Sequence, residues 1–207
     1  MHGWNVITCY RASGLANVRR NIMYGKTLIA LLLASTPVWA APYDVDTTAS
    51  RIGFGGTHAG NAFEGTFERW TAEIDFDAAV PEHSKLKAVI GLASAKTGNA
   101  MYDGTLPTAD WFDVANTPQG VFESTSVQRK EREIYTVTGT LTIRGKSVPV
   151  SFDVTLPQAQ LDTGAVDTTF TLTLNRLDFG IGAKSDATAE WVSNPIDLKI
   201  RLVAHKR

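Results

Sequence analysis

The sequence predicts an all-β protein, an antiparallel barrel or sandwich of about eight strands with one short helical insertion. The first observation is that apolar and polar residues alternate with a period of two after residue 42, as they do in strands with one buried face. The second is that threonine fills much of the polar face, which suits a strand because threonine is β-branched. The third is that no long segment has a helical period. One-sided strands without long helices are typical of antiparallel barrels and sandwiches.

Each predicted strand shows this alternation in its own sequence. In residues 72–77, for example, the apolar Ile74 and Phe76 alternate with the carboxylates Glu73 and Asp75. The segments that alternate or nearly alternate are 50–54, 72–77, 86–90, 135–143, 148–156, 169–174 and 196–202.

The connections between these segments are also marked in the sequence. Residues 144–147 read Arg-Gly-Lys-Ser between two long alternating segments, which predicts a hairpin. Residues 158–165 contain Asp162 and Gly164 and are predicted as a turn. Residues 99–114 lack the period of two, so we expect one or two short helices there. No break in composition divides residues 41–207, which we predict to be a single domain.

The first forty residues have the layout of an export signal that follows an N-terminal extension. From Met23 onward, Lys26 precedes the apolar stretch Thr27–Ala34, and small residues lead to a predicted cleavage after Ala40. The apolar stretch is about half of the roughly 20 residues that span a bilayer, so we expect no permanent membrane insertion. We predict translation to start at Met23, cleavage of the signal, and a periplasmic location for residues 41–207. The sequence leaves open whether export uses the general or the twin-arginine route.

The charge distribution argues against nucleic acid as a partner. Residues 1–40 hold four of the 20 Lys and Arg and none of the 21 Asp and Glu, so the remaining residues carry a formal charge of −5. A net-acidic body without a basic segment has little attraction for nucleic acid. The lone cysteine, Cys9, lies in the segment that we expect to be removed, so the exported protein would have no disulfide and no thiolate ligand.

The sequence also predicts neither a metal site nor a catalytic site. The three histidines after residue 40 lie far apart and lack metal-ligand spacing. No nucleophile motif or phosphate-binding loop is present, and His58 is the single plausible general base. We therefore expect a protein that is not an enzyme and needs no cofactor.

The alternation places a large set of residues on the inward face of the predicted strands, almost all of them apolar. Val121 is one of these residues. A barrel of about eight strands can be filled by its side chains or can enclose one small ligand, and the sequence leaves both open. Gly65 and other glycines near the first strands would either leave a slot or only allow bending. The residues predicted to line a ligand site are Ile52, Phe54, His58, Phe63, Gly65, Phe67, Ile74, Phe76, Trp111, Phe112, Phe122, Tyr135, Leu141, Phe152 and Phe170.

Several segments in this order resemble the YceI family of exported lipid-binding proteins. The matching segments are 50–54 running to His58, 65–67, 106–113, 121–124, 139–145, 148–150 and 175–180. The resemblance implies an extended lipocalin-like barrel with a helical piece between the fourth and fifth strands. It further implies that the core holds a long amphiphile such as a polyisoprenoid, an isoprenoid quinone or a fatty-acid-like molecule, often in a homodimer, without catalysis.

The sequence departs from the usual pattern of this family at two places. The family usually has an arginine or lysine near the start of the helical segment and a tyrosine before the proline of the fifth strand. In this chain the corresponding residues 106–108 read Leu-Pro-Thr and residues 116–118 read Asn-Thr-Pro.

We expect a periplasmic lipid-binding protein for transport, storage or sequestration, with a functional link to a membrane cytochrome suggested by some relatives. The first alternative is a ligand-free β-domain that acts through protein–protein contacts in envelope stress or assembly. The second is a lipid-directed enzyme that uses His58.

Overall fold

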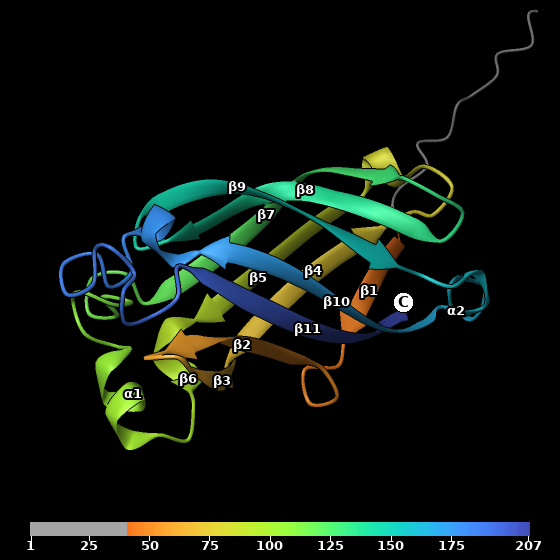
Figure 1. The fold of residues 1–207 in the computed structure, drawn as a ribbon. Helices are drawn as coiled ribbons and strands as arrows, with labels where there is room; N and C mark the ends of the chain where they lie inside the picture. The colour runs from red at the N-terminus through yellow and green to blue at the C-terminus, as the bar shows by residue number, and fades with distance from the viewer. Residues whose placement is uncertain (1–40) are drawn as a thin grey trace, which may run out of the picture. The chain divides into compact units, whose positions relative to one another are not determined.

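The computed structural model describes residues 41–207, and the predictions for residues 1–40 lie outside this part of the chain. The described residues form an antiparallel β-structure with two short α-helices and three 3₁₀ helices (Figure 1). The strands are β1 Ala41–Val45, β2 Arg51–His58, β3 Asn61–Phe67, β4 Trp70–Phe76, β5 Lys85–Gly91, β6 Ala95–Lys96, β7 Gln119–Arg129, β8 Ile134–Ile143, β9 Lys146–Thr155, β10 Ala165–Asn175 and β11 Pro195–Lys206. The helices are α1 Ala100–Thr105, α2 Gln158–Thr163, η1 Pro81–His83, η2 Leu92–Ser94 and η3 Arg176–Phe179.

The strands follow the order β6-β3-β2-β11-β1-β4-β5-β7-β8-β9, and β10 pairs with the other edge of β11. The two ends of this curved sheet meet where β9 lies beside β10. No backbone ladder is described at this seam, where the Thr168 hydroxyl donates a hydrogen bond to the carbonyl of Thr155 at 2.8 Å. The predicted lipocalin-like all-β fold is therefore confirmed, as a barrel whose sheet is not fully closed.

The described residues 41–207 form eleven strands rather than about eight, for local reasons. The Asp46 carboxylate accepts hydrogen bonds from the backbone N–H of Thr48 and Ala49, which forms a turn that separates β1 from β2. The two-residue β6 is a short addition to the edge of β3. If β1 and β2 count as one interrupted strand and β6 is left out, the helical piece lies between the fourth and fifth strands, as expected.

Two turns differ in how well the sequence predicted them. The predicted hairpin is formed by Arg144 and Gly145, which have φ angles of 53° and 71° as a type I′ turn requires. The predicted turn at 158–165 instead contains α2, which ends at Gly164 in the left-handed conformation. The helical insertion expected near 99–114 is confirmed as α1, whose first turn is capped by the Asn99 side chain.

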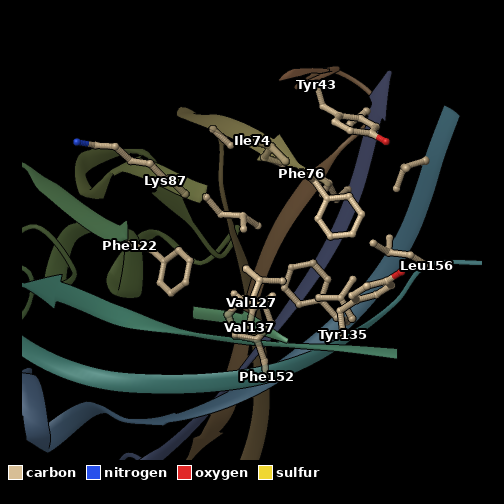
Figure 2. A pocket seen from close by; sticks show the side chains of 18 of the residues that line it. Tyr43, Ile74, Phe76, Lys87, Phe122, Val127, Tyr135, Val137, Phe152 and Leu156 are labelled. Atoms are coloured by element: carbon tan, nitrogen blue, oxygen red, sulfur yellow. The ribbon is translucent and has the colours of Figure 1, made fainter. Parts of the chain in front are cut away.

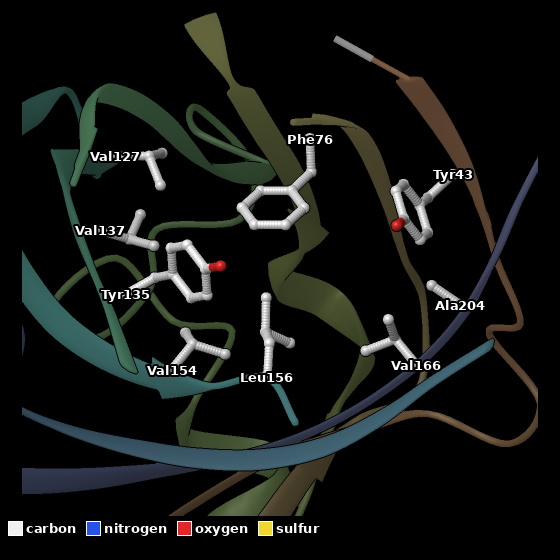
Figure 3. Close-up of a cluster of buried hydrophobic side chains, with 9 residues drawn as sticks. All are labelled: Tyr43, Phe76, Val127, Tyr135, Val137, Val154, Leu156, Val166 and Ala204. Atoms are coloured by element: carbon white, nitrogen blue, oxygen red, sulfur yellow. The ribbon is translucent and has the colours of Figure 1, made fainter. Parts of the chain in front are cut away.

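The apolar side chains inside the barrel form two clusters, one toward each end. Figure 3 shows the cluster near α2, whose buried members are Tyr43, Phe76, Val127, Tyr135, Val137, Val154, Leu156, Val166 and Ala204. The second cluster lies toward the connections that follow α1 and η3, and its buried members are Phe54, Leu92, Ala95, Phe112, Leu141, Val150, Phe179 and Ile181. The barrel therefore has an elongated interior, with Phe122 packed against both clusters.

Candidate functional site

The larger of two apolar cavities in the barrel, here called cavity A, lies within the cluster near α2 (Figure 2). Its volume is about 130 Å³. Its lining comes from β1, β2, β4, β5 and β7 to β11 and includes Tyr43, Ile52, Trp70, Ala72, Ile74, Phe76, Leu86, Lys87, Ala88, Phe122, Val127, Tyr135, Val137, Phe152, Val154, Leu156, Val166, Phe170, Leu202 and Ala204. The one charged side chain in this set, Lys87, pairs at its Nζ with Glu123 at 2.8 Å on the exposed surface. The cavity itself is therefore apolar.

The second cavity, here called cavity B, lies toward the other end of the barrel and has a volume of about 120 Å³. It is lined by Ile52, Phe54, Phe63, Phe67, Ile90, Leu92, Leu106, Trp111, Phe112, Gly120, Leu141, Ile143, Leu174, Arg176, Phe179, Ile181, Val192, Ile196 and Leu198. Ile52 borders both cavities, so they are neighbours in one elongated interior. The side chains of Ile52 and Phe122 contribute to the partition between them.

The interior is not filled by side chains. Phe170, Leu174 and Leu198 all line the cavities, yet each is only half-buried. In a packed core, side chains at such positions touch neighbours on every side and lose nearly all of their accessible surface. Apolar cavities of this kind stay dry and accept apolar ligands. Of the two interpretations that the sequence left open, the cavities favour a ligand-enclosing barrel.

Gly65 does not provide the slot that we considered from the sequence. A Cβ on Gly65 would overlap the ring of Phe54, its partner across the β2–β3 ladder, and would lie 2.8 Å from the carbonyl oxygen of Lys96. A Cβ on Gly139 would likewise lie 2.5 Å from Cε2 of Phe122. Each glycine therefore gives room to an aromatic ring, and it is the ring that borders the cavity.

Thirteen of the fifteen residues predicted to line the site do border a cavity. Those at cavity A are Ile52, Ile74, Phe76, Phe122, Tyr135, Phe152 and Phe170, and those at cavity B are Ile52, Phe54, Phe63, Phe67, Trp111, Phe112 and Leu141. His58 and Gly65 border neither cavity. The lining residues that the prediction missed include Tyr43 in the middle of the short strand β1, Trp70 at the start of β4, and Ala88, whose small side chain gave no signal of a lining position.

His58 makes a structural contact in place of the ligand contact that we expected. Its Nδ1 lies 2.8 Å from the hydroxyl of Tyr102 on α1, and the two rings pack edge to face. Its backbone forms an isolated bridge with Val192. The histidine therefore joins the end of β2 to α1 and to the segment before β11.

Cavity B is covered by segment 176–194, which a buried arginine holds together. Arg176 is 3% exposed, and its guanidinium donates to the backbone carbonyls of Ile181 and Val192 at 2.7 and 2.9 Å. It also donates to the carboxylate of Asp186 at 2.6 Å and lies 5.7 Å from the ring centroid of Trp111. This network fixes the wall of cavity B, and Arg176 contributes to that wall without presenting a free charge.

The Asp186 carboxylate stays ionised in this buried position. Burial opposes its ionisation, but backbone N–H groups of Val192, Trp191 and Glu190 donate to it, and Arg176 supplies a positive charge. Together these interactions hold the pKa of Asp186 below its ordinary value of 3.8. Burial also lowers the pKa of the Arg176 guanidinium, against the opposing effect of Asp186.

The segment after α1 is joined to segment 176–194 by a second set of polar contacts. The Asp110 carboxylate accepts hydrogen bonds from the backbone N–H groups of Lys184 and Ser185 at 3.0 and 2.9 Å. Arg144, in the β8–β9 hairpin, donates to the carbonyls of Ala109 and Gly180. Leu106, Trp111 and Phe112 are thereby kept against cavity B.

Two further properties of residues 41–207 bear on the function. No group of three or more His, Cys, Asp or Glu side chains gathers there as a metal site would require. The helices of this part of the chain are all too short or too polar to cross a membrane.

Comparison with known proteins places this barrel among described relatives. The model of the YceI-like domain matches residues 43–204. A UPF0312 protein of Pseudomonas savastanoi is 35% identical over 170 residues, which cover 77% of this chain and 88% of that protein. A UPF0312 protein of Pseudomonas fluorescens is 33% identical over 196 residues, which cover 89% of this chain and 100% of that protein.

Several solved structures also resemble this barrel. BcnA of Burkholderia cenocepacia superposes with a TM-score of 0.72 at 29% identity, covering 77% of this chain and 99% of that chain. The YceI protein of Campylobacter jejuni gives 0.59 at 27% identity, covering 69% and 84%. A polyisoprenoid binding domain from Saccharophagus degradans gives 0.58 at 16% identity, covering 80% and 98%, a likeness that shows the fold alone.

Proposed function

The chain belongs to the YceI-like domain family, and we propose that it is a non-catalytic carrier that encloses a long apolar chain in cavities A and B. The observation that carries the proposal is the pair of neighbouring apolar cavities along an elongated barrel. An isoprenoid is a suitable occupant, because the Saccharophagus domain that shares this fold is described as polyisoprenoid binding.

The apolar lining supplies enough free energy for such binding without a charged anchor. Each methylene that leaves water contributes about 0.8 kcal/mol, so a buried chain of about twenty carbons contributes roughly 16 kcal/mol, which exceeds the roughly 4–15 kcal/mol that association costs. A chain longer than one cavity would displace the side chains of Ile52 and Phe122 and would then occupy both. These two side chains border the partition without making a polar contact, so their movement breaks no hydrogen bond.

The proposal extends to the cell envelope. The signal-like segment before Ala41 supports export to the periplasm, where an apolar chain needs a protein host to cross water. Transport, storage or sequestration of the chain would each use the same cavities. The homodimer and the functional link to a membrane cytochrome belong to the proposal through the family resemblance.

The alternative functions have weaker support. A ligand-free domain that works by protein contact calls for a filled core and a large exposed apolar patch. Among residues 41–207, the large apolar side chains that are exposed are Met101 and Trp191, and the core contains cavities. An enzyme that uses His58 is disfavoured because this side chain bonds to Tyr102 and borders neither cavity.

The direct test is to identify the molecules that the protein carries. Mature protein is purified without detergent, extracted with organic solvent and measured by mass spectrometry, together with its uptake of added isoprenoids. Ala88→Leu should reduce uptake because Ala88 lines cavity A, whereas Thr171→Leu on the exposed face of β10 is the matched control. Absence of extracted lipid together with absence of uptake would overturn the proposed function.

A further inference from the structure

The most unusual group in the interior is the hydroxyl of Tyr135. Tyr135 lies on β8 and is 1% exposed, among the largest fully buried side chains of residues 41–207. Its hydroxyl oxygen is buried and has no hydrogen-bond partner among residues 41–207. A buried tyrosine hydroxyl normally finds a partner, because leaving one unpaired costs about 1–3 kcal/mol.

The position of this hydroxyl points to a ligand as the absent partner. Tyr135 lines cavity A, and Figure 3 shows its hydroxyl directed toward the space between Phe76 and Leu156. The ring is held in this direction by Phe76, which packs edge to face on it with centroids 5.1 Å apart. Arg129 covers the ring with its guanidinium carbon 5.3 Å from the centroid. The donor is therefore fixed in place at the edge of an apolar cavity.

The surroundings also determine what kind of head group could accept this hydrogen bond. Within the part of the chain that the structure describes, Lys87 is the one cationic residue lining cavity A, and its ammonium pairs with Glu123 on the exposed surface. Arg129 does not line the cavity, and it donates to the carbonyl of Ala78. A phosphate or diphosphate in cavity A would therefore be a buried anion without a cation, which is strongly unfavourable.

A second phenol lies at the same end of the cavity. Tyr43 on β1 also lines cavity A, and burial followed by interaction with Tyr135 raises the pKa of its hydroxyl. The Tyr43 phenol is therefore a neutral donor at neutral pH, which suits an uncharged acceptor.

The geometry points to cavity A as the subsite for an uncharged head group that carries a hydrogen-bond-accepting oxygen, with Tyr135 as its donor. The tail of such an amphiphile then extends past Ile52 and Phe122 into cavity B. A quinone carbonyl, a ketone and an amide have the required chemistry. This inference rests on the proposed function, because it assigns an orientation to the chain that the barrel holds.

The test compares two probes with the same tail on a six-membered ring, 2-geranylgeranyl-1,4-benzoquinone, whose ring has two carbonyl groups, and geranylgeranylbenzene, whose aromatic ring has none. Dissociation constants are measured for lipid-free wild type, Tyr135→Phe and the control Tyr102→Phe, whose hydroxyl bonds to His58 outside both cavities. We expect Tyr135→Phe to weaken quinone binding roughly 2- to 12-fold, as for one neutral hydrogen bond, and to leave the hydrocarbon unchanged. Tyr102→Phe should change neither constant.

Two further measurements distinguish loss of the hydrogen bond to the ligand from a change in the shape of cavity A. The infrared carbonyl stretch of the bound quinone should move to higher frequency in Tyr135→Phe, because the carbonyl loses its donor. Ligand-free Tyr135→Phe should melt at the same temperature as wild type or higher, since the removed hydroxyl had no partner.

The outcomes that would overturn the inference are distinct from those that would overturn the proposed function. Equal loss of both probes, no loss of the quinone, or tighter binding of geranylgeranyl diphosphate than of the quinone would each overturn the assignment of cavity A while the carrier function stands. Failure of wild type to bind any of the three probes would instead overturn the proposed function, and this inference with it.

Discussion

Substitution of Gly65 tests how the interior is packed, because the ring of Phe54 occupies the space that a side chain at position 65 would need. A Cβ at position 65 would lie 2.8 Å from Cε1 of Phe54 and 2.8 Å from the carbonyl oxygen of Lys96. Comfortable contacts between carbon atoms are about 3.5–4.0 Å, so Gly65→Ala requires both neighbours to move by roughly 1 Å. Overpacking of this kind costs about 1–3 kcal/mol.

The size of the effect should depend on Phe54, and a double-mutant cycle measures that dependence. Phe54→Leu removes the ring atoms that the new Cβ would meet, while the conflict with the Lys96 carbonyl stays. Gly65→Ala should therefore cost less in the Phe54→Leu background, with a coupling of about 0.5–3 kcal/mol. Free energies of unfolding from urea titrations of the four proteins give this coupling directly.

The control for the glycine cycle is Gly53→Ala in β2. A Cβ there would lie 3.4 Å from the carbonyl oxygen of Lys199 and 3.6 Å from that of Gly65, which are acceptable contacts. We expect this substitution to be neutral or to stabilise the protein by up to about 1 kcal/mol, because alanine restricts the unfolded chain. If the Gly65 and Phe54 effects add within about 0.5 kcal/mol, the ring does not occupy the space above Gly65 and our account of the β2–β3 wall is wrong.

Two other predictions concern the buried ion pair and the export signal. Asp186→Asn should destabilise the protein by about 3–5 kcal/mol because it leaves the Arg176 charge buried without its partner, whereas Asp167→Asn, in an exposed pair with Arg201, should have little effect. Since the pKa of Asp186 is lowered on folding, its contribution to stability is present above its ordinary value of 3.8 and is lost as the pH falls through the lower folded value. Urea midpoints between pH 7 and pH 2 should therefore fall less steeply in Asp186→Asn, and an unchanged slope would contradict the assignment. Protein recovered from the periplasm should begin at Ala41, and an intact chain confined to the cytoplasm would refute the signal.

The strands were predictable because one face of each meets water and the other does not. The alternation in β8 and β9 survives along most of their length, and the turn between them has glycine at its second central position, Gly145, as type I′ hairpins favour. We predicted that Val121 on β7 faces inward. This prediction is wrong, because Val121 pairs with Thr142, which faces outward. A β-bulge between Ser124 and Ser126 adds one residue to that strand, and nothing in the alternation of a single strand locates such an addition.

The cavities could not be predicted, because a lining residue and a packed residue look the same in a sequence. Phe170 is half-buried beside cavity A and Tyr135 is fully buried beside it, although both occupy inward positions on alternating strands. The difference depends on how much volume the facing strands supply, which is a property of the assembled barrel. Small residues such as Ala72 and Ala88 face each other across the β4–β5 ladder and leave space in front of them.

For the same reason, the sequence does not show what the glycines make room for, and it predicts a ligand contact for His58 that the structure does not contain. A glycine in a strand signals a close approach, but the sequence does not say whether a ligand or a neighbouring ring makes that approach. For Gly65 and Gly139 the approaching group is a phenylalanine from the adjacent strand, so these glycines build the cavity wall one layer behind the surface that a ligand would touch. His58 lies at the end of β2, where the chain leaves the barrel, and its ring turns to Tyr102 on α1. The ligand surface is therefore set by the middle of the strands, and their ends hold the segments that cover it.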